Sequence, residues 1–173
     1  MLTEQSIVGF IGTGVMGKSM AGHILKAGFR TIVYSRTKEK AAELLDQGAE
    51  WVDSPVELAE KADVIITMVG FPHDVEEIYL GQNGILNHAR PNTYVIDMTT
   101  SKPSLAKKIY ALAKEKKVHA LDAPVSGGDI GAQNAQLSIM VGGDDEDYDA
   151  VKDLLGMLGS NIVHQGPPGA GQH

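Results

Sequence analysis

The sequence predicts an α/β protein built around a doubly wound, mostly parallel sheet. Two observations predict this fold: short apolar runs alternate with helical patterns along the chain, and the first run leads directly into a glycine-rich loop. Parallel strands need crossover connections, which such an alternation supplies. With 173 residues, 43% of them hydrophobic, the chain can bury one sizeable core. We therefore expect a single domain over residues 1–165.

In the first half of the chain, continuous apolar runs predict strands and apolar residues at helical spacing predict helices. Gly28 and Gly48 are expected to end two helices. Pro55, preceded by Ser54 as a capping residue, is expected to open a third. The run 64–69 is typical of a central parallel strand. The predicted order is strand 6–11, helix 15–27, strand 31–34, helix 38–45, a short strand at Val52, a helix from Pro55 and strand 64–69.

The second half continues the alternation and then changes. The predicted elements are helix 74–80, strand 94–97, helix 103–116, strand 118–121, a loop over 126–136, strand 137–141, helix 145–158 and strand 162–163. The acidic residues 144–147 fit a helix start, where negative charge is favoured. The last elements are interpreted as an extension of the same sheet.

Composition excludes several classes of function. The net charge of -7 disfavours nucleic acid, because binding to phosphates needs a surplus of Lys and Arg. The absence of cysteine excludes disulfides and thiolate chemistry and fits a cytoplasmic protein. No export signal or apolar run of about 20 residues is visible, so no membrane association is expected. The six histidines show no pairing with carboxylates at helical spacing, so no metal site is expected.

The segment Gly12-Thr13-Gly14-Val15-Met16-Gly17 has the GxGxxG spacing of a dinucleotide-binding loop. It follows a strand and opens a helix, so its amides and the positive helix end face one point, as in a Rossmann-like fold. Gly12 permits the turn, Gly14 lets a phosphate approach, and Gly17 allows close helix packing. The alternative is a glycine-rich turn that binds nothing. We expect all six residues to contact a dinucleotide.

The end of the second predicted strand bears on which dinucleotide binds. NAD-binding folds place an acidic residue there for the ribose 2′-hydroxyl, but this chain has Ser35, Arg36 and Thr37. A guanidinium and two hydroxyls suit a 2′-phosphate, which favours NADP over NAD. The alternative is that Arg36 is a solvated surface charge.

In open α/β sheets, ligands bind beyond the carboxyl ends of the strands. Thr100 is positioned to bond the nicotinamide end, and Ser126 with the amides of Gly127 and Gly128 to bind a substrate carboxylate. Alternatively, Thr99 and Thr100 are helix caps ahead of Pro103. Further cofactor contacts are expected from Met68, Val69, Gly70, Pro72 and Val75.

Three segments resemble the β-hydroxyacid dehydrogenases, the family that includes 3-hydroxyisobutyrate dehydrogenase and tartronate semialdehyde reductase. Residues 9–17, with Met20 and Ala21, resemble the family's opening signature, and residues 122–128 its substrate-binding signature. Residues 136–143 resemble the following strand, although Ala135 stands where many members have glycine. Residues 35–37 are similar to NADP-preferring members and to the related 6-phosphogluconate dehydrogenases.

The resemblance implies hydride transfer between NADP(H) and a small 3-hydroxy acid or semialdehyde. It also implies that residues 166–173 begin a linker to a helical domain that this chain lacks, with the catalytic lysine expected after His173. None of Lys102, Lys107 and Lys108 matches that lysine's motif. We therefore expect the isolated chain to be inactive and the full-length protein to form a homo-oligomer through the missing domain. The alternative is a non-catalytic NADP-binding sensor or partner-binding module.

Overall fold

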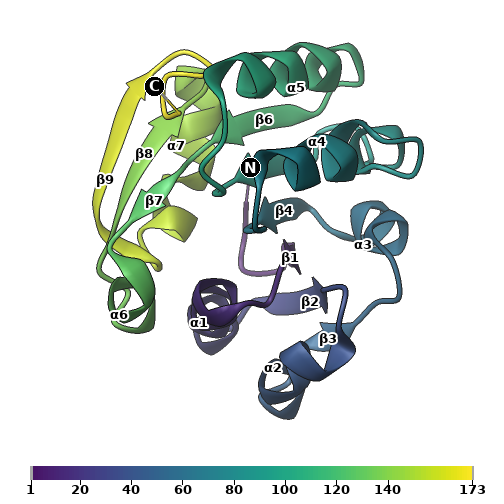
Figure 1. Ribbon diagram of the computed structural model, residues 1–173, viewed down its shortest axis with the longest axis vertical. Coiled ribbons are helices and arrows are strands. Elements are labelled where there is room, and N and C mark those ends of the chain that lie inside the picture. The colour runs from purple at the N-terminus through teal and green to yellow at the C-terminus, as the bar shows by residue number, and fades with distance from the viewer. Residues whose placement is uncertain (1, 173) are drawn as a thin grey trace.

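The computed structural model describes residues 2–172 and shows one nine-stranded sheet with helices on both faces (Figure 1). The strand order is β3-β2-β1-β4-β5-β6-β8-β7, and β9 pairs with β8. The strands are β1 Ile7–Ile11, β2 Arg30–Tyr34, β3 Glu50–Trp51, β4 Val64–Thr67, β5 Tyr94–Asp97, β6 His119–Asp122, β7 Val125–Ser126, β8 Leu137–Gly142 and β9 Gly159–Gly166. The α-helices are α1 Val15–Lys26, α2 Ala42–Asp46, α3 Pro55–Lys61, α4 Pro72–Leu80, α5 Pro103–Glu115, α6 Gly128–Gln133 and α7 Asp145–Leu155, and short 3₁₀ turns cover Lys38–Ala41 and Ile85–Asn87.

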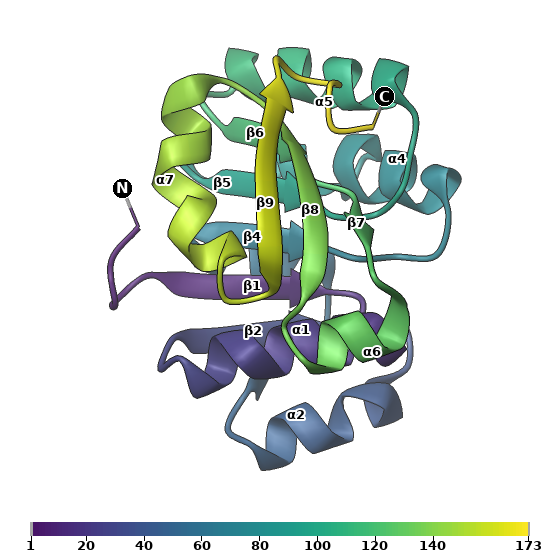
Figure 2. The same cartoon turned by 90° about the vertical axis from the view of Figure 1, so that its left-hand side faces the viewer.

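The predicted fold class is confirmed, because most neighbouring strands run parallel. All pairs from β3 to β6 are parallel, and so is the pair β8–β9. The pairs β6–β8 and β7–β8 are antiparallel. In Figure 2, β8 and β9 run across the direction of β1, β4 and β5. The extension is therefore part of the same sheet but turned relative to its centre.

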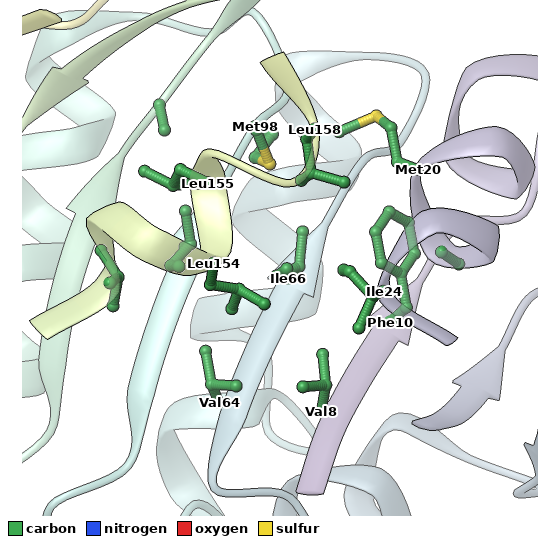
Figure 3. Packing of buried hydrophobic residues seen from close by; sticks show 14 of the residues in the cluster. Val8, Phe10, Met20, Ile24, Val64, Ile66, Met98, Leu154, Leu155 and Leu158 are labelled. Carbon is green, nitrogen blue, oxygen red and sulfur yellow. The ribbon is translucent and has the colours of Figure 1, made fainter. Parts of the chain in front are cut away.

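Each face of the sheet has its own core. Helices α1, α2, α6 and α7 cover one face, and α3, α4 and α5 cover the other. On the first face, Phe10 and Ile66 of β1 and β4 meet Ile24 of α1 and Leu154 of α7 (Figure 3). These side chains are at most 3% exposed. Burying the central strands on both faces explains their continuous apolar sequence.

Helix starts follow the sequence signals in part. The Ser54 hydroxyl accepts a bond from the Glu57 amide, and Pro55 stands at the first turn of α3, as predicted. Asp144 precedes α7, whose first turn holds the other acidic residues of the run. Helix α5 starts after Lys102 with no side-chain cap, so the alternative that Thr99 and Thr100 cap it is wrong.

Three element predictions also differ from the structure, two in the kind of element and one in its bounds. The segment 126–136 was expected to be a loop, yet it contains the end of β7 and the helix α6. Gly128 and Gly131 weaken the helical signal of α6, which forms with Ala132 buried in the core. Val52 was expected to lie in a short strand, but it directly follows β3. Its burial in the core, and not a place in the strand, explains why it is apolar. The last strand is eight residues long, whereas only residues 162–163 were predicted. Its residues alternate between exposed and half-buried positions, so most of the strand does not form an apolar run.

No helix within residues 2–172 is long and apolar enough to cross a bilayer. His173, the last residue of the expected linker, lies outside the described residues. The rest of that segment does not extend away from the domain. β9 includes Gly166, and the Gly143 amide bonds its carbonyl at 3.0 Å.

Candidate dinucleotide-binding site

A cavity of about 1080 Å³ lies at the carboxyl ends of β1, β2 and β4. It extends from the start of α1 to the far end of α4, because Gly81 and Gln82 also line it. The structure brings together at this cavity most residues that the sequence singled out for cofactor contact. These are Gly12, Thr13, Gly14, Val15, Met16, Gly17, Ser35, Arg36, Thr37, Met68, Val69 and Gly70.

The glycine loop is shaped by three different constraints. Gly12 has a positive φ of 100°, and a Cβ there would lie 2.1 Å from the Met68 carbonyl oxygen. A Cβ on Gly17 would lie 2.2 Å from the Gly12 carbonyl oxygen. Around Gly14, in contrast, no atom lies within 4 Å of the Cβ position. The fold itself needs the outer glycines, whereas Gly14 leaves space that a ligand can occupy.

The start of α1 offers unsatisfied donors to this space. No side chain caps the helix at Gly14, so its first amides have no intrahelical or capping partner. The Thr13 hydroxyl is buried, with the residue 3% exposed, and has no protein partner among the described residues. An uncapped helix start beside an unpaired buried hydroxyl is an arrangement that binds an anionic oxygen. The residues present therefore fit the pyrophosphate of a dinucleotide.

Cationic side chains lie at the carboxyl end of β2. The Arg36 guanidinium is exposed and donates to the Asp74 carboxylate at 2.8 Å. Asp74 is buried in the first turn of α4, and its other oxygen accepts the Phe71 amide at 3.2 Å. Arg36 and Asp74 thus join two walls of the cavity. Lys40 lines the same end.

The neighbours of Arg36 differ in their availability. The Ser35 hydroxyl is buried and donates to the Thr37 carbonyl at 2.8 Å, so it is already used within the turn. Thr37 is exposed and precedes the 3₁₀ turn Lys38–Ala41 without capping it. Of the three predicted residues, Thr37 is exposed, and Arg36 is exposed but already paired with Asp74 through one of its nitrogens.

The remaining predicted residues do not line the cavity. Val75 is wholly buried in the core, and Pro72 forms the first turn of α4. Thr100 is exposed, while its neighbour Thr99 accepts the Val69 amide at 3.0 Å and ties the end of β5 to that of β4. The predicted carboxylate site, Ser126, Gly127 and Gly128, is exposed at the start of α6. Asp129, the next residue, lines the cavity, so this group lies at its rim.

A buried polar cluster joins the ends of β4 and β5 to helix α4. The Thr67 hydroxyl contacts the Tyr79 hydroxyl at 2.7 Å and donates to Asp97 at 3.0 Å. Burial raises the pKa of Asp97 to about 6, although bonds from Thr99 and Thr67 oppose the rise. Burial likewise raises the pKa of Tyr79 well above its usual value. No group of three or more His, Asp or Glu side chains suited to a metal ion occurs within residues 2–172.

Sequence reasoning missed four charged residues of the cavity, which are Lys40, Asp74, Glu77 and Asp129. Lys40 follows Arg36 by four residues, and this basic spacing at the start of a helical turn could have identified it. Asp74 gave no usable signal, because an acid in the first turn of a helix is explained by the helix dipole alone. Its pairing with Arg36 joins residues 38 positions apart, and only the fold brings them together.

Comparison with known proteins assigns the family. Residues 7–166 match the family described as the NAD binding domain of 6-phosphogluconate dehydrogenase. The chain is 61% identical over 169 residues to YkwC, an uncharacterized oxidoreductase of Bacillus subtilis, covering 98% of this chain and 59% of that protein. It is 40% identical over 171 residues to the mitochondrial 3-hydroxyisobutyrate dehydrogenase of Bos taurus, covering 99% of this chain and 51% of the relative.

A solved structure agrees with this assignment. The 3-hydroxyisobutyrate dehydrogenase of Mycobacterium tuberculosis, determined with L-serine, matches with a TM-score of 0.91 and 34% identity, over 97% of this chain and 57% of that one. The chain spans little more than half the length of such relatives. Because the match extends over nearly all of its own residues, the chain belongs to the β-hydroxyacid dehydrogenase family, as an NAD-binding domain of that family.

Proposed function

We propose that this chain is the NADP-binding part of a dehydrogenase that transfers a hydride between NADP(H) and a small 3-hydroxy acid or semialdehyde. The observation that carries the proposal is the open start of α1, with free space at Gly14 and the unpaired Thr13 hydroxyl, facing a cavity with Arg36 and Lys40 at one end. Bound NADP supplies or accepts the hydride at its nicotinamide ring.

The amides at the start of α1 would hold the pyrophosphate, and the Thr13 hydroxyl would add a donor. Arg36 and Lys40 would receive the 2′-phosphate, since a guanidinium forms charge-assisted bonds with phosphate oxygens. A similar protein has been solved with this cofactor: Psf3, in complex with NADP+ and 2-OPP, matches with a TM-score of 0.91 and 31% identity, over 95% of this chain and 58% of that one. These features favour NADP over NAD.

The substrate would be oriented by its carboxylate. Ser126, Gly127 and Gly128 are exposed and directly precede Asp129, which lines the cavity, so a small anion could reach them there. L-Serine, present in the Mycobacterium tuberculosis structure, is itself a 3-hydroxy acid. This supports a small hydroxy acid as the substrate class.

We propose that the proton-transferring lysine is not among the residues described. Within 2–172, Lys40 is the lysine that lines the cavity, and it lies at the end assigned to the 2′-phosphate. Lys107 does not line the cavity, and its aliphatic chain packs beside Gly169. The isolated chain should therefore bind NADP and produce no NADPH from 3-hydroxy acids. Steady NADPH formation at 340 nm would contradict this part of the proposal.

Calorimetry with NADP and NAD tests the cofactor assignment. The chain should bind NADP more tightly, and Arg36→Ala should weaken NADP binding by about tenfold or more, because a charge-assisted bond contributes roughly 1.5–3 kcal/mol. NAD binding should change little. Lys40→Ala should have a smaller effect in the same direction.

Lys38→Ala is the matched control, because Lys38 is an exposed lysine of the same turn that does not line the cavity. Its loss should leave both affinities unchanged. Tighter binding of NAD than NADP by the unsubstituted chain, or equal effects of Lys38→Ala and Lys40→Ala, would refute the assignment of the 2′-phosphate site.

A further inference from the structure

The segment 166–172 returns to the carboxyl edge of the sheet after β9. In Figure 2 it turns over the end of β9 and comes down beside α5. The Ala170 amide donates to the Pro167 carbonyl at 2.9 Å, which closes a turn within the segment. This path brings the end of the described chain to the side of the sheet that carries the cavity.

One carboxylate holds this segment. Asp122, at the end of β6, accepts the Gly169 amide on Oδ1 at 2.9 Å and the Gln172 amide on Oδ2 at 3.1 Å. The residue is only 4% exposed. Burial raises the pKa of its carboxyl group, and the bonds from these amides act against that rise by favouring the charged form. Both oxygens of a buried acid are thus committed to a segment about 50 residues away in sequence.

The packing around this carboxylate leaves no space for side chains. A Cβ on Gly171 would lie 2.5 Å from the Met140 carbonyl oxygen and 2.8 Å from that of Asp122. A Cβ on Gly142, the register partner of Asp122 on β8, would lie 2.6 Å from the carboxylate. Glycine at both positions lets three backbone segments approach the same carboxylate.

A second contact fixes the segment to the next strand. The Gln172 side chain donates from Nε2 to the Thr99 carbonyl at 2.7 Å and accepts the Ser101 amide on Oε1 at 2.8 Å. A single amide group therefore satisfies both a donor and an acceptor of the loop after β5. Asp122 and Gln172 together join the ends of β5, β6 and β8 to the segment 166–172.

The neighbouring strand shows that this arrangement is specific to Asp122. Asp97 is its register partner on β5 and is also buried, but it accepts bonds from Thr67 and Thr99 within its own region. Asp97 makes no contact with the segment 166–172 among the hydrogen bonds found in residues 2–172. Of two adjacent buried carboxylates, one is bonded to residues at the ends of β4 and β5 and the other holds the segment.

We propose that Asp122 is a positioning residue that fixes residues 166–172 over the carboxyl ends of β5 and β6, so that this segment loses its ordered position when the carboxylate is removed. This role concerns the described chain alone and is tested without any nucleotide.

Amide hydrogen exchange followed by NMR provides the test. In the unsubstituted chain, the Gly169 and Gln172 amides should exchange at least tenfold more slowly than in an unstructured peptide. Asp122→Ala should raise both rates by about tenfold or more, with the amides of β1 and β4 unchanged. Asp122→Asn keeps one acceptor oxygen and should release the two amides unequally. Affinity for NADP should be the same in all three proteins.

Asp97→Asn is the matched control, because it removes a buried charge from the paired strand without touching the segment. It should leave the Gly169 and Gln172 rates unchanged. Fast exchange of these amides in the unsubstituted chain, or wild-type rates in Asp122→Ala, would overturn the proposal. A global loss of protection in Asp122→Asn would also count against it, since the residue would then stabilise the whole domain. Failure of NADP to bind would refute the proposed function and leave the role of Asp122 standing.

Discussion

Two stretches of the same sheet edge differ in how their polar groups are satisfied. Over β1, β2 and β4, the start of α1 is uncapped, the Thr13 hydroxyl is unpaired and a large cavity opens above them. Over β5, β6 and β8, the Asp122 carboxylate and the Gln172 amide are bonded within the protein. We call these the open edge and the closed edge. The buried Ser101 hydroxyl of the closed edge also has no partner among the described residues, so the cavity and the uncapped helix start are what distinguish the open edge.

The largest expected effect is the loss of stability on substituting Gly12, a glycine of the open edge that the fold itself requires. Gly12→Ala places a Cβ 2.1 Å from the Met68 carbonyl at a positive φ. We expect a loss in unfolding free energy on the order of 2–4 kcal/mol, measured by urea denaturation. Gly28→Ala is the control, because it has a similar φ but no neighbour within 4 Å. Only the strain of about 1 kcal/mol should remain there, and equal losses in the two variants would contradict the steric account.

The next effect concerns the buried carboxyl group of Asp97, at the end of β5 in the closed edge. The pKa of Asp97 is raised from 3.8 to about 6, so the folded state favours its protonated form. The stabilisation is complete below about pH 4 and is lost as the pH rises through 6, by roughly 3 kcal/mol in total. Asp97→Asn removes this dependence, because the amide stays neutral and its oxygen can accept the same bonds. Its unfolding free energy relative to wild type should rise between pH 4 and pH 7. A pH-independent difference would contradict the assignment, and Asp46→Asn, at an exposed position, controls for the loss of a charge.

These contrasts show which parts of the molecule could be predicted from sequence. Apart from β3, the elements from β1 to β6 were predicted well, because buried parallel strands carry continuous apolar runs and the helices between them carry helical spacing. The region after Asp122 was predicted less well. β9 alternates between exposed and half-buried residues, and α6 contains two glycines, so neither has a strong local pattern.

The same limit applies to the site. The glycine loop and Arg36 are local motifs, and the sequence pointed to them directly. The pairs Arg36–Asp74 and Asp122–Gly169 join residues far apart in the chain, so they follow from the topology and not from spacing. Thr99 illustrates the cost of reading a residue locally: it was a candidate helix cap, but its hydroxyl accepts the Val69 amide of the neighbouring strand end.

Substituting Gly14 should have a smaller effect on stability and should change mainly the affinity for NADP. Gly14→Ala adds a methyl group where no protein atom lies within 4 Å, and the backbone φ of -67° is allowed for alanine. Unfolding free energy should therefore change by less than about 1 kcal/mol. NADP affinity should fall by about tenfold, because the methyl group occupies space meant for the pyrophosphate. Calorimetry measures the affinity, and unchanged binding would show that no ligand approaches Gly14.

The most direct test of the difference between the two edges is a titration of the ¹⁵N-labelled chain with NADP, followed by amide chemical shifts. We expect saturable changes at Gly12–Gly17 and at residues 35–40, with the chemical shifts of the Gly169 and Gln172 amides unchanged. Changes concentrated on residues 166–172, or no saturable change at the glycine loop, would contradict the assignment of the open edge as the dinucleotide site.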